Sequence, residues 1–163
     1  MFVDADHAHE QAYRDVQNAI RHLNPGGVVV MHDCSPHSHE MQVVPYQSGA
    51  WTGDVWRTIV RLRWEGQHAV RVVNSDYGLG LVIPGGTPHH FARRPYKPEV
   101  VSYADLVANR QDLLGLLSGW EWREWVERAR PRKTTTVTVA APVCTCPNGL
   151  CPVHRLLRQQ RKV

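Results

Sequence analysis

The sequence lacks long apolar runs and a secretion signal. No stretch of its 163 residues approaches the roughly 18 consecutive apolar residues that a membrane-spanning helix needs. The first residues, Met1–Asp6, do not show the basic and then apolar layout of a signal peptide. The composition, 42% hydrophobic and 21% charged, is that of a globular domain with a core. We therefore expect a cytoplasmic protein that has no membrane partner.

Acidic residues are missing from the C-terminal segment 130–163. This segment holds seven of the 19 Lys and Arg residues and none of the 15 Asp and Glu residues. Residues 1–129 therefore carry 12 basic and 15 acidic side chains, a formal charge of −3, although the whole chain has a charge of +4. The basic character belongs to the tail, which can contact a nucleic acid or an acidic surface, or can simply be solvated.

Internal repeats are also missing, and the order of apolar patterns indicates an α/β fold. The pair Phe2-Val3 is typical of the end of a strand. Apolar residues then recur at three- and four-residue spacing from Ala8 to Leu23, which predicts a helix. The continuous apolar run Val28–Met31 predicts a strand buried on both faces of a parallel sheet. Strand, helix and strand together form a βαβ unit.

The middle of the chain is expected to complete the sheet. Residues 34–51 have no apolar period and predict a long loop. A helix over 53–64 follows, with Thr52 as its cap and Gly66 at its end. The turn between predicted strands 69–73 and 77–83 is short, so this pair must be antiparallel.

The last part of the chain predicts two helices and a tail. The helices are expected over 102–118 and 120–129, and we interpret Trp120, Trp122 and Trp125 of the second as packing residues. Linker composition begins at Pro131. The predicted organisation is therefore an α/β part over 1–97, helices over 98–130, and a linker with a basic Cys/His tail over 131–163.

Acids and imidazoles follow both strands of the predicted βαβ unit. Asp4, Asp6 and His7 come after the first strand, and His32 and Asp33 come after the second. Adjacent parallel strands lie about 4.8 Å apart, so these two groups should face one another at the carboxyl edge of the sheet. Carboxylates with imidazole can hold a divalent cation, and a histidine can accept a proton near neutral pH.

A purely structural interpretation of the same residues is also open. Asp6 could cap the helix that follows it, because Asp is a preferred residue at helix starts. His32 and Asp33 would then only form hydrogen bonds within their loop.

With these residues in place, the segment from Phe2 to Asp33, including Asn24-Pro25-Gly26-Gly27, resembles the fourth to fifth strands of class I S-adenosylmethionine-dependent methyltransferases. It is most similar to the groups that contain caffeoyl-CoA, catechol and macrolide-sugar O-methyltransferases. Trp51–Trp56, Asp76–Gly78 and Ser102–Arg110 extend the resemblance to about residue 118. The resemblance implies the C-terminal half of a Rossmann-like methyltransferase sheet that ends in an antiparallel hairpin, followed by helices and an irregular tail.

The resemblance also implies roles for individual residues. It places a metal carboxylate at Asp4, the general base at His7, a metal pair at His32 and Asp33, and a residue near the cofactor at Asp6. The relatives usually have two acids, or Asp-Asn, at the pair, so His32 is a departure. Because imidazole suits transition metals better than magnesium, the departure weakens a magnesium assignment.

The glycine-rich turn that grips S-adenosylmethionine in this superfamily lies upstream of the matched region. Gly78 and Gly80 lie within a strand pattern, and Gly85-Gly86 precedes no helix, so neither pair replaces that turn. Three explanations are open: Met1 is not the true start, a separate polypeptide or a second copy supplies the missing half, or the chain is a decayed remnant.

Cysteines are few and uneven: Cys34 stands alone, and three others crowd into the tail. Clustering without an export signal favours thiol or metal chemistry over disulfides. The tail offers a tetrahedral zinc set, and the alternative is a redox-active or simply reduced tail. The residues of the zinc set are Cys144, Cys146, Cys151 and His154.

Three functional hypotheses follow. The leading one is O-methyl transfer from S-adenosylmethionine to a small hydroxylated or sugar substrate, with a divalent metal and with doubtful activity of the chain alone. The second is a non-catalytic interaction module whose zinc-binding basic tail contacts a protein or nucleic acid. The third is a small zinc protein in which the α/β part is only a scaffold.

Overall fold

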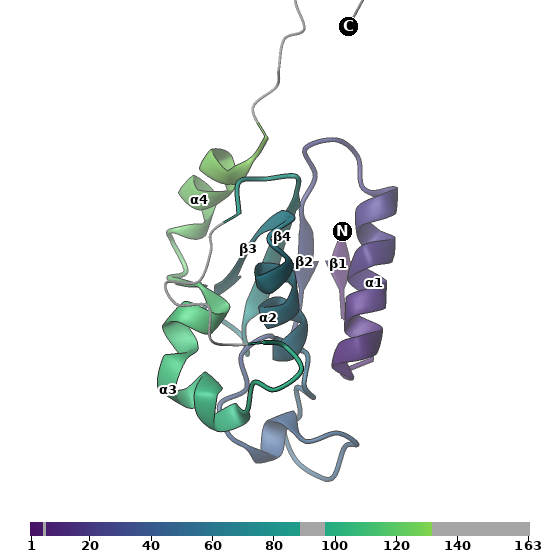
Figure 1. Cartoon of the computed structure of the whole chain (residues 1–163), viewed down its shortest axis with the longest axis vertical. Helices are drawn as coiled ribbons and strands as arrows, with labels where there is room; N and C mark the ends of the chain where they lie inside the picture. The colour runs from purple at the N-terminus through teal and green to yellow at the C-terminus, as the bar shows by residue number, and fades with distance from the viewer. Residues whose placement is uncertain (5, 89–96, 132–163) are drawn as a thin grey trace, which may run out of the picture. The chain divides into compact units, whose positions relative to one another are not determined.

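The computed structural model describes residues 1–4, 6–88 and 97–131. Among them is a five-stranded sheet with the strand order β1-β2-β4-β3-β5 (Figure 1). The strands are β1 (Phe2–Val3), β2 (Val29–Met31), β3 (His68–Val73), β4 (Leu79–Pro84) and β5 (Leu116–Leu117). The helices are α1 (His9–His22), α2 (Trp56–Glu65), α3 (Tyr103–Leu114) and α4 (Trp122–Ala129), with a 3-10 turn, η1 (Glu40–Gln42). The prediction of a mixed α/β fold is confirmed.

The first three elements form the predicted βαβ unit. β1 and β2 are parallel, with Phe2 opposite Val30 and Val3 opposite Met31. On its other side β2 pairs with β4, and this pairing is antiparallel, with Met31 opposite Gly80. β2 was expected within a parallel sheet, but it is parallel to β1 on one side only and antiparallel to β4 on the other. Because β4 begins where β2 ends, the turn before β4 lies at the same edge as the ends of β1 and β2.

Helices cover both faces of the sheet. One core lies between the sheet and α1, α2 and α3, and a second lies between the sheet and α4. Side chains of β3 alternate between the two faces of the sheet. Val70 and Val72 belong to the first core, and Ala69 and Val73 belong to the second. The helices predicted over 98–130 thus pack on the same sheet as the α/β part. No helix in the described ranges combines the length and the apolar character needed to cross a membrane.

The start of α2 differs from the prediction. The helix begins at Trp56, and Thr52 does not cap it, because the Thr52 hydroxyl donates to the carbonyl oxygen of Met41 at 3.1 Å. Its end at Gly66 is as predicted, with a left-handed φ of 65° that glycine adopts without strain. The loop predicted over 34–51 is present and contains η1.

The end of α3 also differs. Its capping box joins Ser102 and Asp105, close to the predicted start. Gly115, with φ of 59°, stops the helix, and Leu116–Leu117 then forms β5 beside β3. The prediction of helix up to residue 118 was wrong, because a leucine pair continues a helical pattern as well as it extends a sheet.

The second of the predicted C-terminal helices is α4. Trp125 is buried and Trp122 packs against the second core, as predicted, but Trp120 is 77% exposed and precedes the helix. The predictions for the linker and for the zinc set of the tail fall on residues 132–163, which lie outside the described residues.

Candidate metal site

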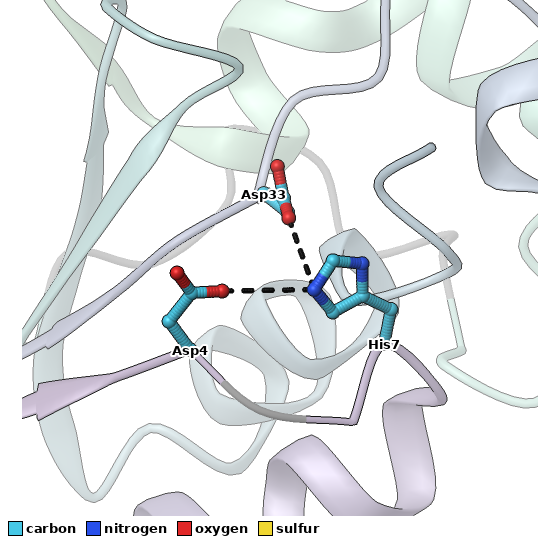
Figure 2. A group of neighbouring side chains, drawn as sticks. All are labelled: Asp4, His7 and Asp33. Atoms are coloured by element: carbon cyan, nitrogen blue, oxygen red, sulfur yellow. Dashed lines mark ion pairs between the residues drawn. The ribbon is translucent and has the colours of Figure 1, made fainter. Parts of the chain in front are cut away.

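The polar residues that follow β1 and β2 converge at one edge of the sheet. Asp4, His7 and Asp33 each offer a ligand atom, and these atoms all lie within 4.8 Å of one another. Figure 2 shows Asp4 and His7 on the segment that follows β1 and Asp33 on the segment that follows β2, with one ring nitrogen of His7 facing both carboxylates. Nε2 of His7 is 3.6 Å from Oδ1 of Asp4 and 3.3 Å from Oδ2 of Asp33. The parallel register explains the meeting, because it places the ends of both strands side by side.

These separations are compatible with a shared cation. Two ligand atoms that each lie about 2.1 Å from an ion are about 3.0–3.4 Å apart at octahedral or tetrahedral angles. The distances of 3.3 and 3.6 Å from Nε2 of His7 are close to that range. The two contacts of His7 are therefore compatible with a divalent metal that is shared with both carboxylates.

Asp33 is the buried member of the group. Its side chain is only 7% exposed, whereas that of Asp4 is 41% exposed. Burial raises the pKa of Asp33 above its ordinary value, although His32 and His7 act against this. Its backbone also has a left-handed φ of 61°, which is uncommon outside glycine but tolerated by Asp. The fold thus holds a carboxylate where its charge is costly unless a cation compensates it.

His32 adjoins the trio from the side. Its Nδ1 is 3.3 Å from Oδ1 of Asp33 and 3.8 Å from Oδ1 of Asp4, while its Nε2 is 3.1 Å from Oδ2 of Asp76. Burial alone would lower the pKa of His32, but the carboxylates of Asp33, Asp76 and Asp4 outweigh it and the pKa is raised. The imidazole is thus enclosed by negative charge on both of its nitrogens.

His7 is held from the loop that precedes α2. Its ring stacks on Trp51, with centroids 4.8 Å apart and planes at 27°, and its carbonyl oxygen accepts the backbone N–H of Asp54 at 3.0 Å. Gly53 lies so close that a Cβ there would be 1.9 Å from the same carbonyl oxygen. Nδ1 of His7 is buried and has no hydrogen-bond partner in the described part of the chain. The loop therefore fixes the ring with Nε2 directed to the carboxylates.

Asp6, predicted near a cofactor, interacts locally. Its Oδ1 accepts the backbone N–H of Ala8 at 3.0 Å, just before α1. The interpretation of Asp6 as the helix cap was wrong, because the N-cap residue of α1 is Ala8, which makes no side-chain capping bond. The first helical N–H, that of His9, is instead accepted by Oδ1 of Asp54 at 2.7 Å, and Nδ1 of His9 lies 2.6 Å from Oδ2 of the same residue.

Three residues of the site were not identified from the sequence: Trp51, Asp54 and Asp76. Each reaches the site only through tertiary packing, so no local spacing pointed to it. For Asp76 a signal did exist, because an antiparallel strand paired with β2 must bring its preceding turn to the carboxyl edge. That inference needed the sheet order, which the sequence did not provide.

The glycine pairs do not form a nucleotide-binding turn. Gly78 and Gly80 lead into and lie within β4, and Gly85 and Gly86 directly follow that strand. A phosphate-binding glycine turn leads from a strand into a helix, so neither pair has the required context. This outcome agrees with the sequence-based prediction.

Comparisons with known proteins give one match. Residues 1–34 match the family model described as a methyltransferase domain. The matched segment contains β1, α1 and β2 and includes Asp4, His7, His32 and Asp33. Neither the curated proteins nor the solved structures gave a match. Over its first βαβ unit, the chain is thus similar to a methyltransferase domain.

Proposed function

We propose that the chain is a metal-binding, methyltransferase-like domain that acts on the hydroxyl group of a small molecule. The observation that carries the proposal is the meeting of Asp4, His7 and Asp33 within 4.8 Å, inside the segment that matches the methyltransferase domain. A buried carboxylate, an exposed carboxylate and an imidazole at the ends of parallel strands form a ready ligand set. Ligand sites of α/β sheets are commonly found at this edge.

The donor set favours a transition metal over magnesium. Magnesium prefers oxygen ligands, whereas imidazole raises the affinity for manganese, iron, cobalt or zinc. We assign Nε2 of His7 to the ion, because this atom is at ligand distance from both carboxylates. The family resemblance had instead implied a general base at His7, so the two roles are alternatives that experiment separates.

The residues of the chain would hold and orient the substrate. A divalent ion bound here would supply Lewis acidity, which makes a hydroxyl group easier to deprotonate. Asp4, 41% exposed, leaves the site accessible from solvent, while buried Asp33 fixes the opposite side. Positioning of this kind accounts for much of the rate in transfer reactions.

The proposal of a methyl donor rests on fewer observations than the proposal of a metal site. The match to a methyltransferase domain suggests S-adenosylmethionine in general terms. Within the described residues, Asp6 is engaged at the start of α1, and the glycine pairs do not form a nucleotide turn. The residues present thus do not fit the donor.

A manganese titration of the full chain tests the proposal. Manganese favours oxygen and nitrogen ligands over thiolates, so it avoids the tail cysteines. We expect one tight site, with binding weaker for Mg²⁺, lost in Asp33→Asn and His7→Gln, and unchanged in His22→Gln. His22 is a suitable control because its imidazole lies at the other end of α1, where Nδ1 is 2.9 Å from the carbonyl oxygen of Asn18.

The same variants separate the two roles of His7. If His7→Gln leaves manganese affinity intact, our assignment of Nε2 to the ion is wrong and the role of general base is the one that remains. If the unmodified chain binds no manganese, or if Asp33→Asn binds it equally well, the metal centre itself is refuted.

A further inference from the structure

His32 and Asp76 together form a feature that the metal trio does not explain. The His32 ring bridges two acids, with Nδ1 at 3.3 Å from Asp33 and Nε2 at 3.1 Å from Asp76. Nδ1 of His32 lies next to Oδ1 of Asp33, whereas Nε2 of His7 lies next to Oδ2 of the same carboxylate. His32 therefore occupies the side of Asp33 that the trio leaves unused.

The turn that carries Asp76 is strained and firmly docked. Asp76, Tyr77 and Gly78 have consecutive left-handed φ values of 46°, 56° and 92°. Such runs are costly for residues other than glycine and persist where the surroundings hold them, often at functional sites. Here two backbone bonds hold the turn, since Cys34 and Ser35 donate to the carbonyl oxygens of Gly78 and Tyr77 at 3.0 and 2.6 Å.

The docking leaves no space between the turn and the segment that follows β2. A Cβ at Gly78 would lie 2.6 Å from the Cβ of Ser35 and 2.7 Å from its backbone nitrogen. Ser35 is itself fixed, because its hydroxyl accepts a hydrogen bond from Arg110 of α3 at 2.8 Å. The backbone thus specifies where Asp76 stands relative to His32.

We propose that Asp76 and His32 are positioning residues of the metal centre: Asp76 fixes the His32 ring, and His32 holds Asp33 with Oδ2 turned toward His7 and the ion. The inference rests on the metal centre proposed above. In this proposal His32 does not bind the ion itself, whereas the resemblance implied that it is a metal ligand. Partners of this kind are worth about 10- to 100-fold in metal affinity.

The test measures Mn²⁺ affinity of the full chain and the number of imidazoles on the bound ion. We expect Asp76→Asn to weaken binding about tenfold and His32→Gln by about 10- to 100-fold. The double variant should be no weaker than His32→Gln alone, because the two residues act in series. Asn at position 76 retains the tolerance for left-handed φ, so the turn should remain folded.

Glu124→Gln is the matched control, since it removes one acid from α4 whose side chain is 69% exposed, against 68% for Asp76. It should leave the affinity unchanged, which excludes a general effect of net charge. Electron spin-echo spectra of bound Mn²⁺ should show one coordinated imidazole in the unmodified chain and in Asp76→Asn.

The outcomes separate this inference from the function on which it rests. Two coordinated imidazoles, or additive losses in the double variant, would overturn the positioning role while the metal centre stands. Normal affinity in Asp76→Asn would do the same. An unmodified chain that binds no Mn²⁺ removes the metal centre, and the positioning role with it.

Discussion

At the scale of single residues, the site depends on contacts that tolerate no added atom. Gly53 supports the backbone of His7, and its left-handed φ of 57° is a second reason for glycine. The ring of His7 is held by stacking on Trp51 and not by a hydrogen bond to Nδ1, within the described ranges. Its position therefore depends on the neighbouring loop.

Gly53→Ala should damage the site far more than the same change at Gly49. Both glycines have left-handed φ values, 57° and 78°, but a Cβ at Gly49 would meet no atom of the described residues within 4 Å, whereas one at Gly53 would lie 1.9 Å from the carbonyl oxygen of His7. We expect a loss of about 1 kcal/mol for Gly49→Ala and more than about 3 kcal/mol for Gly53→Ala, with loss of Mn²⁺ binding only in the latter. Urea unfolding and manganese titration measure both. Equal losses in the two variants would contradict the proposed support of His7.

The buried Asp33 carboxylate should cost stability when no ion is present. Because the pKa of Asp33 is raised in the folded state, the folded protein binds this proton more readily than the unfolded chain does. Its contribution to the free energy of unfolding therefore falls as the pH rises through the folded pKa. The free energy of unfolding of Asp33→Asn, relative to that of the unmodified chain, should therefore be greater at about pH 7 than at about pH 4. Urea unfolding in chelator at both pH values tests this, and a pH-independent difference would count against it.

At the scale of elements, the β3–β4 hairpin contributes to the site through its turn. The sequence predicted the hairpin and its antiparallel pairing, both of which are confirmed. It did not predict that β4 adds to β2, and only that pairing brings Asp76 beside His32. Period and turn length are local signals, whereas the choice of neighbour in a sheet depends on the whole core.

Gly78→Ala and Gly85→Ala form a second matched pair at the two ends of β4. Both positions have left-handed φ values, 92° and 64°, but among the residues that the structure describes a Cβ at Gly85 would meet only Pro131, at 4.0 Å, while one at Gly78 would collide with Ser35. Gly78→Ala should displace the turn and weaken Mn²⁺ binding at least as much as Asp76→Asn does. Gly85→Ala should lower stability by about 1 kcal/mol with unchanged affinity. Unchanged affinity in Gly78→Ala would show that the docked turn has no part in the metal centre.

At the scale of the whole molecule, the site joins segments that are distant in the sequence. The ends of β1 and β2 provide the ligands, the loop before α2 supports His7, and the β3–β4 turn supports His32. The carboxyl edge, Asp4, His7, His32 and Asp33 could be predicted from the sequence because they follow two adjacent strands of one βαβ unit. The supporting residues could not, since their contacts form only in the folded core.

Metal binding should therefore stabilise the whole described domain. Because the ligands converge only in the folded state, an ion at about 100 times its dissociation constant should add about 2.7 kcal/mol to the free energy of unfolding. The denaturant dependence of that free energy should not change, because the same surface becomes exposed. Urea titrations with and without Mn²⁺ test this, with Asp33→Asn as the variant that should not respond. A change in the slope alone would indicate that the ion acts on the unfolded chain.

Cys34, next to Asp33, offers a way to time the opening of this edge through its reaction with an alkylating reagent. Its thiol is 0% exposed, and burial raises its pKa, so the folded chain shields it from alkylation. Its side chain belongs to the first core, and its backbone N–H donates to the carbonyl oxygen of Gly78 in the docked turn, so a reagent reaches the sulfur when this part of the core opens. The rate at which mass spectrometry detects modified Cys34 thus reports how often this part of the core opens, and an ion held by Asp33 should slow that rate.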